Sequence, residues 1–308
     1  MKIFKIKKTN ISKKIYFLGI PIYTSKSVDF VKNISIFGIK IKRHLELNKI
    51  LSYIEDLKYN LPIQIQASVV HSYLQKYRNC NKDKDVVIIA CGPTANYYDS
   101  IKDAKHLAIN KAVVFNKINF DYSFLTDFYS TNDTNQIVDE YDNEKCEKFY
   151  CLIPERRFQE IAHLENCGQI PMSNYMNSNS NILLLEDVVA HKWARELSFE
   201  PLGDFEGTVF SALQFLLYTH PKRIYLVGCD ETSGYFFDNK NHKITVNEYA
   251  LNIWKKFKKF ADYEYRDIEI ISVNPVGLKG LFKDVYTKEY LNNHPEIDSN
   301  GVEILENK

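Results

Sequence analysis

The stretch RIYLVGCDETSGYFFDNKNH (residues 223–242) changes character halfway along its length. Its first half is apolar, has the length of one strand, and is typical of a strand that is covered on both faces. Its second half is polar and places Asp230, Glu231, Tyr235 and His242 directly after that strand. The stretch therefore predicts a buried strand of a parallel sheet, followed by a loop at the edge where such sheets bind ligands.

Strand-like and helix-like segments alternate on either side of this stretch. This order calls for parallel strand pairing with helices on both faces of the sheet. The strand candidates are residues 86–91, 106–110, 121–127, 148–154, 223–230 and 268–275, and the helix candidates are residues 209–219 and 250–261. We expect an α/β fold in residues 85–308, with a doubly wound, mostly parallel, Rossmann-like sheet.

The N-terminal segment differs from the rest of the chain in charge and in pattern. Residues 1–43 contain eleven Lys or Arg and one acidic residue, whereas the whole chain has a formal net charge of +1. Two similar runs, KIYFLGIPIY (14–23) and NISIFGIKIK (33–42), repeat with a period of nineteen residues. They predict short strands or hairpins with a bulge at the shared glycine, and Pro21 predicts an edge position.

Helical patterns follow the basic repeat. Residues 45–84 show apolar positions spaced three and four apart, with Pro62 between two helical stretches, the second of which runs through Val69, Val70 and Tyr73. We expect residues 1–84 to form a small basic β and helical extension. One interpretation is an appendage that packs on the main domain. The other is a surface that lies against the anionic inner membrane, where each Lys or Arg adds about 1 kcal/mol.

The composition weakens several interpretations. The 308 residues are 45% hydrophobic and 26% charged, so the chain can fill a large core and has no global field that attracts nucleic acid. The six cysteines form no CxxC pair, which favours free thiols and argues against a zinc site. The longest apolar runs are far short of the roughly 20 residues of a membrane helix. The Lys-rich start is unlike a signal peptide, and we expect a cytoplasmic protein.

The sheet edge also selects the candidate ligand-binding residues. In ACGPTA, Gly92 allows a tight turn and Thr94 can cap a helix, which can bring backbone N–H groups close to a phosphate. FEGTVFSA contains a second glycine turn of this kind, and an ordinary helix start explains both turns as well. The predicted set comprises Gly92, Pro93, Thr94, Asn110, Asp127, Gly207, Thr208, Asp230, Glu231 and Asn274.

His242 is a candidate general base. It lies in the loop that follows the acids at the strand end, and imidazole titrates near neutral pH. A solvated loop histidine would show the same pattern. The chain lacks GxGxxG, Walker, GxSxG and HExxH motifs, which weakens the dinucleotide-binding, P-loop, hydrolase and metalloprotease interpretations.

Three segments in this order, VVIIACGPTANYYD, HLAINKAVVF and EGTVFSALQFLLYTHPKRIYLVGCDETSGYFFD, resemble the bacterial sialyltransferases of glycosyltransferase family 42. The likeness covers about residues 85–275. It implies a Rossmann-like domain that uses a CMP-activated sugar donor without a metal ion and transfers the sugar to a glycan acceptor. It assigns the donor to Gly92, Pro93, Asn110, Gly207 and Asp230, the leaving phosphate to Tyr235, and the general base to His242.

Three residues depart from the family's pattern. Cys91 stands in place of an Asn, Glu206 in place of a Ser, and Thr232 in place of a second Tyr. These departures leave another donor open, such as CMP-Kdo. The run KIYFLGIPIY resembles leader segments of enzymes that build lipopolysaccharide and capsule, which implies a surface glycan or a lipid-linked acceptor.

Two alternatives remain open from the sequence. The same signature is similar to the 6-hydroxymethylpterin pyrophosphokinase-like and motility accessory families, which would imply Mg²⁺-dependent phosphoryl transfer or a role in flagellin modification. A nucleotide-binding scaffold at the membrane surface would use the basic N-terminus without catalysis. A homo-oligomer is compatible with each alternative.

Overall fold

The structure is a computed structural model of the chain, in which contacts define two units, Met1–Lys58 and Tyr59–Lys308. Each unit is described by itself. The residues that the structure describes are 4–8, 12–17, 20–28, 31–36, 39–41, 67–68, 71–125, 141, 145–152, 181–186, 192–205, 207–232, 234–238 and 247–305.

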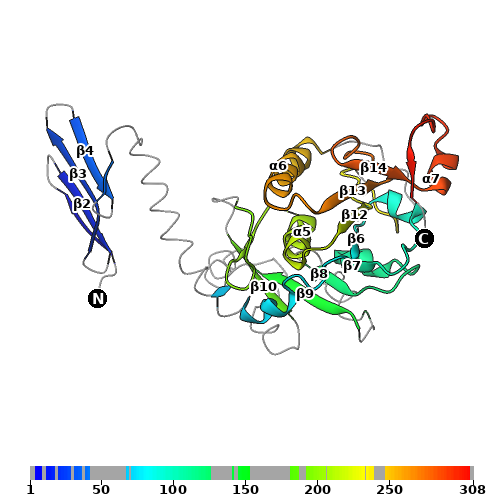
Figure 1. Ribbon diagram of the computed structural model, residues 1–308, viewed down its shortest axis with the longest axis horizontal. Coiled ribbons are helices and arrows are strands. Elements are labelled where there is room, and N and C mark those ends of the chain that lie inside the picture. The colour runs from blue at the N-terminus through cyan, green and yellow to red at the C-terminus, as the bar shows by residue number, and fades with distance from the viewer. Residues whose placement is uncertain are drawn as a thin grey trace. The chain divides into compact units, whose positions relative to one another are not determined.

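The first unit contains a five-stranded antiparallel sheet in chain order (Figure 1). One copy of the sequence repeat supplies the second and third strands and the other copy supplies the last two. Pro21, for which an edge position was expected, belongs to an inner strand, but its partner is Tyr16 of the second strand, and the register that the third strand shares with the fourth begins only at Tyr23. A register shift between Ile15 and Tyr16 lies opposite, and proline is tolerated at such irregularities. The strands are β1 (Phe4–Lys8), β2 (Ser12–Phe17), β3 (Ile20–Val28), β4 (Val31–Ile36) and β5 (Ile39–Ile41).

The expected second helix of the extension is in part a 3₁₀ helix, η1 (His71–Tyr77), rather than an α-helix. Its buried residues are His71, Leu74 and Tyr77, which are three positions apart. A 3₁₀ helix has three residues per turn, so this spacing brings all three onto one side. Val69, Val70 and the whole of the first expected helix lie outside the described residues.

The second unit is built on a ten-stranded sheet in which every pair of neighbouring strands is parallel. The spatial order is β11-β10-β9-β8-β7-β6-β12-β13-β14-β15, which confirms the predicted doubly wound Rossmann-like fold. The strands are β6 (Asp85–Ile89), β7 (Lys105–Ile109), β8 (Tyr122–Leu125), β9 (Glu147–Leu152), β10 (Asn181–Glu186), β11 (Leu202–Gly203), β12 (Arg223–Val227), β13 (Glu269–Val273), β14 (Lys283–Tyr286) and β15 (Glu303–Ile304).

Both faces of this sheet are covered, but by elements of different length. Alternate residues of β6 enter two separate hydrophobic clusters, since Val86 and Ile88 belong to one and Val87 and Ile89 to the other. Side chains of η1 and of the long helices α5 (Thr208–Thr219) and α6 (Glu248–Glu264) fill the first cluster. The short helices η2 (Pro93–Tyr97) and η3 (Asn110–Val114) and their loops fill the second.

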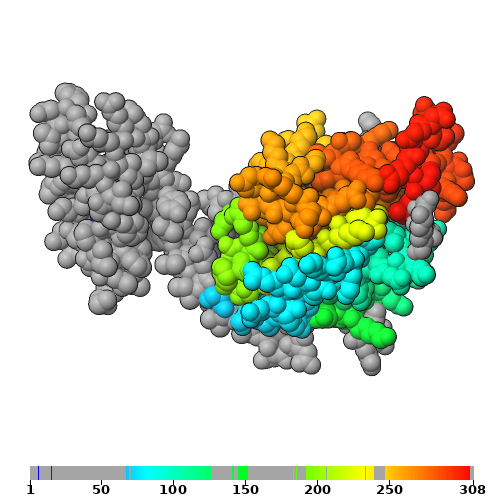
Figure 2. Space-filling model, in the orientation of Figure 1, coloured from blue at the N-terminus to red at the C-terminus, as the bar shows by residue number. Residues whose placement is uncertain are grey.

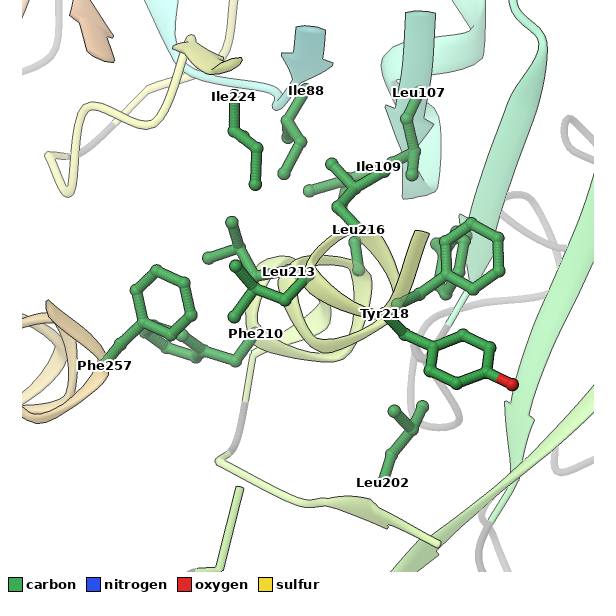
Figure 3. Packing of buried hydrophobic residues seen from close by; sticks show 14 of the residues in the cluster. Ile88, Leu107, Ile109, Leu202, Phe210, Leu213, Leu216, Tyr218, Ile224 and Phe257 are labelled. Atoms are coloured by element: carbon green, nitrogen blue, oxygen red, sulfur yellow. The ribbon is translucent and has the colours of Figure 1, made fainter. Parts of the chain in front are cut away.

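Helix α5 is the centre of the first cluster. It begins after Gly207 and ends at His220, which is in the left-handed conformation that commonly terminates a helix. Figure 3 shows Leu213 and Leu216 of α5 pointing toward the strand residues Ile88 and Ile109. Because nearly every side chain of α5 is buried, its packing fixes where its N-terminus lies relative to the strand ends.

Segments that are far apart in the sequence meet on the surface of the second unit. In the space-filling view, the stretch before and after β6 (cyan) lies against the stretch after α5 (yellow), which in turn meets α6 (orange) (Figure 2). The short helix α7 (Lys288–Asn293) follows β14 and contacts η2. Within the described part of the chain, none of the helices combines the length and apolar composition needed to cross a bilayer.

Candidate functional site

The carboxyl ends of the central strands carry three residues with an unusual backbone. Asn110, Glu231 and Asn274 follow β7, β12 and β13, and each has a positive φ, of 49°, 50° and 49° respectively. Asparagine adopts this left-handed region more readily than most residues, whereas for glutamate it is uncommon. The chain therefore turns sharply at the ends of three strands, at the edge where parallel α/β sheets bind ligands.

A carboxylate joins the loops that follow β6 and β12. The Asp230 side chain accepts a hydrogen bond from the backbone N–H of Thr94 through Oδ2, at 2.9 Å, and another from the Thr94 hydroxyl through Oδ1. The N–H of Gly92 donates to the carbonyl of Gly228 at 2.9 Å. We call this arrangement the Thr94–Asp230 clamp. It connects residues that are 136 positions apart in the chain.

Two glycines make the clamp sterically feasible. A Cβ atom at Gly92 would lie 2.4 Å from Oδ2 of Asp230 and 2.4 Å from the carbonyl oxygen of Gly228. Gly228 itself has a φ of +65°, and a Cβ there would approach the carbonyl oxygen of Ala90 to 2.6 Å. Gly92 is thus required for a close approach between two loops, and the group that approaches it is a carboxylate of the protein itself.

Several backbone donors of the ACGPTA turn are already used within the protein. Gly92 donates to Gly228, Thr94 to Asp230, and Ala95 to the carbonyl of Gly92, while Pro93 has no N–H. Pro93 occupies the start of η2, where a missing donor is tolerated. A phosphate that accepted from the N–H of Gly92, Thr94 or Ala95 would have to replace one of these hydrogen bonds.

The two acids after β12 are buried to different extents. Asp230 is only 4% exposed, and burial raises its pKa to about 6, although the hydrogen bonds from Thr94 oppose the rise. Burial also raises the pKa of Glu231, whose Oε1 accepts a hydrogen bond of 2.6 Å from the indole N–H of Trp254. The site therefore holds two adjacent carboxyl groups whose pKa values are both raised above the ordinary values.

The start of α5 lies beside the end of β7. The side-chain amide of Asn110 donates to the hydroxyl oxygen of Thr208 at 3.0 Å, and Thr208 is the first residue of α5. Gly207 is the N-cap residue and makes no side-chain cap. A helix N-terminus carries partial positive charge and is suited to an anion. The structure thus brings together Asn110, Gly207 and Thr208 from the predicted set.

Asn274 has a different environment from the other predicted residues. Its side chain is 0% exposed. The amide donates to the Thr287 hydroxyl at 3.1 Å, and its oxygen accepts from the Thr287 N–H at 2.8 Å. Thr287 in turn caps α7 by accepting from Tyr290 N–H. Asn274 therefore holds the residue that caps α7, and its contact with a nucleotide-sugar donor stays a prediction.

The loop after β12 folds back onto the η2 turn. The Phe236 N–H donates to the carbonyl of Cys91 at 2.8 Å, and the Asn96 side chain donates to the carbonyl of Phe236 at 3.0 Å. The Phe236 ring meets the edge of Phe115 at a centroid distance of 5.5 Å. Tyr235, predicted to steady a leaving phosphate, is 54% exposed beside this anchor. The described part of this loop therefore lies against the η2 turn, and the role given to Tyr235 remains a prediction.

Some predicted residues fall outside the described part of the chain. These are Asp127 and His242, together with Glu206, one of the departures from the family pattern. Cys91 and Thr232, the other departures, are half-buried, and the Cys91 thiol donates to the Ile109 carbonyl at 3.5 Å. The roles given to Asp127 and His242 remain predictions.

The sequence did not single out several residues that shape the site. Trp254 holds Glu231, and Asn96 holds the loop after β12. Tyr290 of α7 contacts Tyr97 of η2, and burial raises its pKa to about 12, with a smaller contribution from the charge of Asp230. One signal was available for Trp254, because a buried indole N–H usually finds an acceptor. The other pairings depend on tertiary contacts.

Comparison with known proteins finds similarity in structure only. No protein-family model matches the chain, and no curated protein matches its sequence. One similar structure is the "MAf glycosyltransferase from Magnetospirillum magneticum AMB-1", with 11% identity, a TM-score of 0.39, and coverage of 70% of this chain. The present chain spans 37% of that protein.

A second similar structure is the sialyltransferase CstII from Campylobacter jejuni, in complex with the substrate analogue CMP-3FNeuAc. It is 16% identical, with a TM-score of 0.36, and the match covers 73% of this chain and 87% of that one. Neither TM-score reaches 0.5, so an activity for this chain has to be argued from its own residues.

Asp230 gives the site a testable dependence on pH. Its folded pKa of about 6 exceeds the ordinary 3.8, so its contribution to stability is fully present below pH 3.8 and is lost as the pH rises through 6. Two pKa units correspond to about 3 kcal/mol. We expect the free energy of unfolding of the wild type to fall by about this amount relative to Asp230→Asn between pH 4 and pH 8, in urea titrations.

Asp99→Asn is the matched control, because the Asp99 side chain is largely exposed. The difference in unfolding free energy between this variant and the wild type should change little over the same range. A pH-independent difference between the wild type and Asp230→Asn would show that the buried carboxyl does not titrate as described.

Proposed function

We propose that this chain is a glycosyltransferase that moves a sugar from a CMP-activated donor to a surface glycan or a lipid-linked acceptor, without a metal ion. The observation that carries the proposal is the grouping, at the carboxyl edge of the sheet, of the start of α5, the Asn110 amide, the buried Asp230 carboxyl group and the half-buried Glu231 carboxyl group. Parallel α/β sheets bind nucleotides at this edge. The sequence resemblance to family 42 supplies the class of donor.

The proposed phosphate position is the N-terminus of α5. The first turn of a helix offers N–H groups and partial positive charge, which stabilise a phosphate that gains charge as it leaves. Asn110 lies against Thr208 at this point and can reach the same group. Glu231 is the acid suited to accept hydrogen bonds from donor hydroxyls, while Asp230 supports the fold of the site through the clamp.

The proposed reaction is an inverting displacement. The acceptor hydroxyl oxygen forms a bond to the anomeric carbon while the bond from that carbon to the phosphate oxygen breaks. His242 takes the proton of the hydroxyl, and the nucleotide leaves as CMP with the bonding electron pair. Tyr235 donates a hydrogen bond to the leaving phosphate. This sequence of bonds needs neither a redox partner nor a metal ion.

The donor class can be tested by thermal unfolding and transfer in EDTA. We expect CMP to raise the unfolding temperature more than UMP, GMP or ATP does, because the ligand with the lowest dissociation constant stabilises the fold most at equal concentration. At 100 times its dissociation constant, a ligand adds about 2.7 kcal/mol. Transfer from CMP-N-acetylneuraminate or CMP-Kdo should persist in EDTA. Stabilisation by ATP only with Mg²⁺ would favour pyrophosphoryl transfer, and no stabilisation by any nucleotide would contradict both enzymatic interpretations.

The general base can be tested with His242→Ala. A positioned general base contributes about 10² to 10⁴ in rate, so turnover should fall by this factor while the affinity for CMP stays the same. His220→Ala is the matched control. His220 precedes β12 and pairs with Asp267, which precedes β13, so this pair lies at the amino ends of the strands, opposite to the candidate site. Full activity of His242→Ala would refute the assignment.

We further propose that residues 1–43 bring the enzyme to an anionic inner membrane, where a lipid-linked acceptor would be found. Their charge of eleven basic residues against one acidic residue supports an electrostatic contact, and they lie within the first unit. The alternative is that this unit packs on the main domain.

Binding to vesicles that contain phosphatidylserine should therefore weaken as salt rises, because added ions screen surface charges. The interaction should also disappear when residues 1–43 are removed. Sedimentation with vesicles at two salt concentrations measures both effects. Binding that does not depend on the salt concentration, or that remains after residues 1–43 are removed, would contradict the membrane proposal.

A further inference from the structure

Two aromatic rings stand exposed on the loop after β12. Tyr235 is 54% exposed and Phe237 is 41% exposed, although solvent exposure of such large apolar rings is unfavourable. The rings are stacked, with planes 5° apart and centroids 5.2 Å apart. Together they form an offset parallel stack of two rings, which we call the Tyr235–Phe237 platform.

The platform is held in place by the residue between its two rings. Phe236 points inward, where it contacts Phe115, and both its N–H and its carbonyl are hydrogen-bonded to the η2 region. The N–H of Asp238 donates to the carbonyl of Tyr235 at 3.0 Å and closes a turn. The two exposed rings are thus fixed before any ligand arrives, which lowers the entropy lost on binding.

The anchoring contacts place the platform at the edge of the proposed active site. Phe236 bonds to Cys91, which precedes the Thr94–Asp230 clamp, and Phe115 directly follows η3, the helix that begins at Asn110. A ligand on the platform would therefore lie next to the donor region.

We propose that the Tyr235–Phe237 platform binds a pyranose ring of the acceptor glycan through the apolar C–H face of the sugar. Such a face stacks on an aromatic ring while the hydroxyl groups remain in water, which suits an open surface. A nucleobase also stacks on aromatic rings, but recognition of its edge needs polar partners. One N–H of the Asn96 amide, which is close to this loop, is already donated to the Phe236 carbonyl.

This inference rests on the proposed function only for the statement that the bound sugar is the acceptor. Binding of a sugar by the platform can be measured without any transfer reaction. Phe237 is the residue to change, since Tyr235 already has a proposed role at the leaving phosphate.

Saturation-transfer NMR with methyl β-D-galactopyranoside, methyl β-D-glucopyranoside and CMP tests the proposal on the full chain. In the wild type, at least one hexoside should receive saturation mainly at the ring protons of one face. In Phe237→Ala its dissociation constant should rise about tenfold, the factor that one aromatic contact supplies. Phe237→Leu, which keeps much of the volume and removes the ring, should lose the same affinity, and Phe237→Tyr should keep it.

Tyr263→Ala is the control for exposed aromatic residues. Tyr263 is 70% exposed and lies in the last turn of α6, about 24 Å by helical rise from Asn247, whose N–H donates to the Glu231 carbonyl. This variant should bind the hexoside as the wild type does.

Three results would overturn the proposal: no saturation transfer to either hexoside, equal affinity in Phe237→Leu, or a loss of CMP affinity with hexoside binding unchanged. The last result would assign the platform to the nucleobase. Failure of the proposed function has a different signature, because hexoside binding would then respond to Phe237 while no CMP-sugar is used.

Discussion

The candidate site depends on one buried interaction, the pair of hydrogen bonds that Thr94 donates to the Asp230 carboxyl group. A buried carboxyl is costly unless its oxygens have donors, and here one residue supplies both. The close approach of Gly92 and Gly228 allows this geometry. These hydrogen bonds join the loops after β6 and β12 and fix their positions at the edge of the sheet.

The other parts of the site are positioned in relation to this clamp. Gly277 N–H donates to the backbone carbonyl of Asp230, and Asn247 N–H donates to that of Glu231, which connects the start of α6 and the loop after β13. Trp254 then holds the Glu231 side chain from the body of α6. Burial raises the pKa of both acids, and the hydrogen bonds from Thr94 and Trp254 oppose that rise by stabilising the charged forms.

The sequence predicted the fold best where a segment is buried on both faces. The runs that contain β6 and β12 are apolar throughout because the sheet covers them on both sides, and α5 is apolar on nearly all sides for the same reason. The strands β10 and β11, at one end of the sheet, and β14 and β15, at the other end, were missed. β14 and β15 are short and carry charged residues such as Lys283 and Glu303, which form an ion pair.

For the site, the sequence located strand ends but not the partners of the side chains. The contact of Asp230 with a nucleotide stays a prediction, whereas its hydrogen bonds with Thr94 were not foreseen. Asn274 was expected at the same edge, and the structure shows it capping α7 through Thr287. Residues at strand ends can be identified from periodicity, whereas hydrogen bonds between residues more than a hundred positions apart depend on how the strands are ordered.

The central claim is that a nucleotide sugar binds at the carboxyl edge of the sheet, between the Thr94–Asp230 clamp and the start of α5. The most direct test is a crystal structure of the full chain with CMP. The proposal predicts the phosphate at the N-terminus of α5, within hydrogen-bond distance of the Thr208 or Asn110 side chains, and the clamp intact. A nucleotide bound elsewhere, or one whose phosphate displaces Asp230 from Thr94, would contradict it.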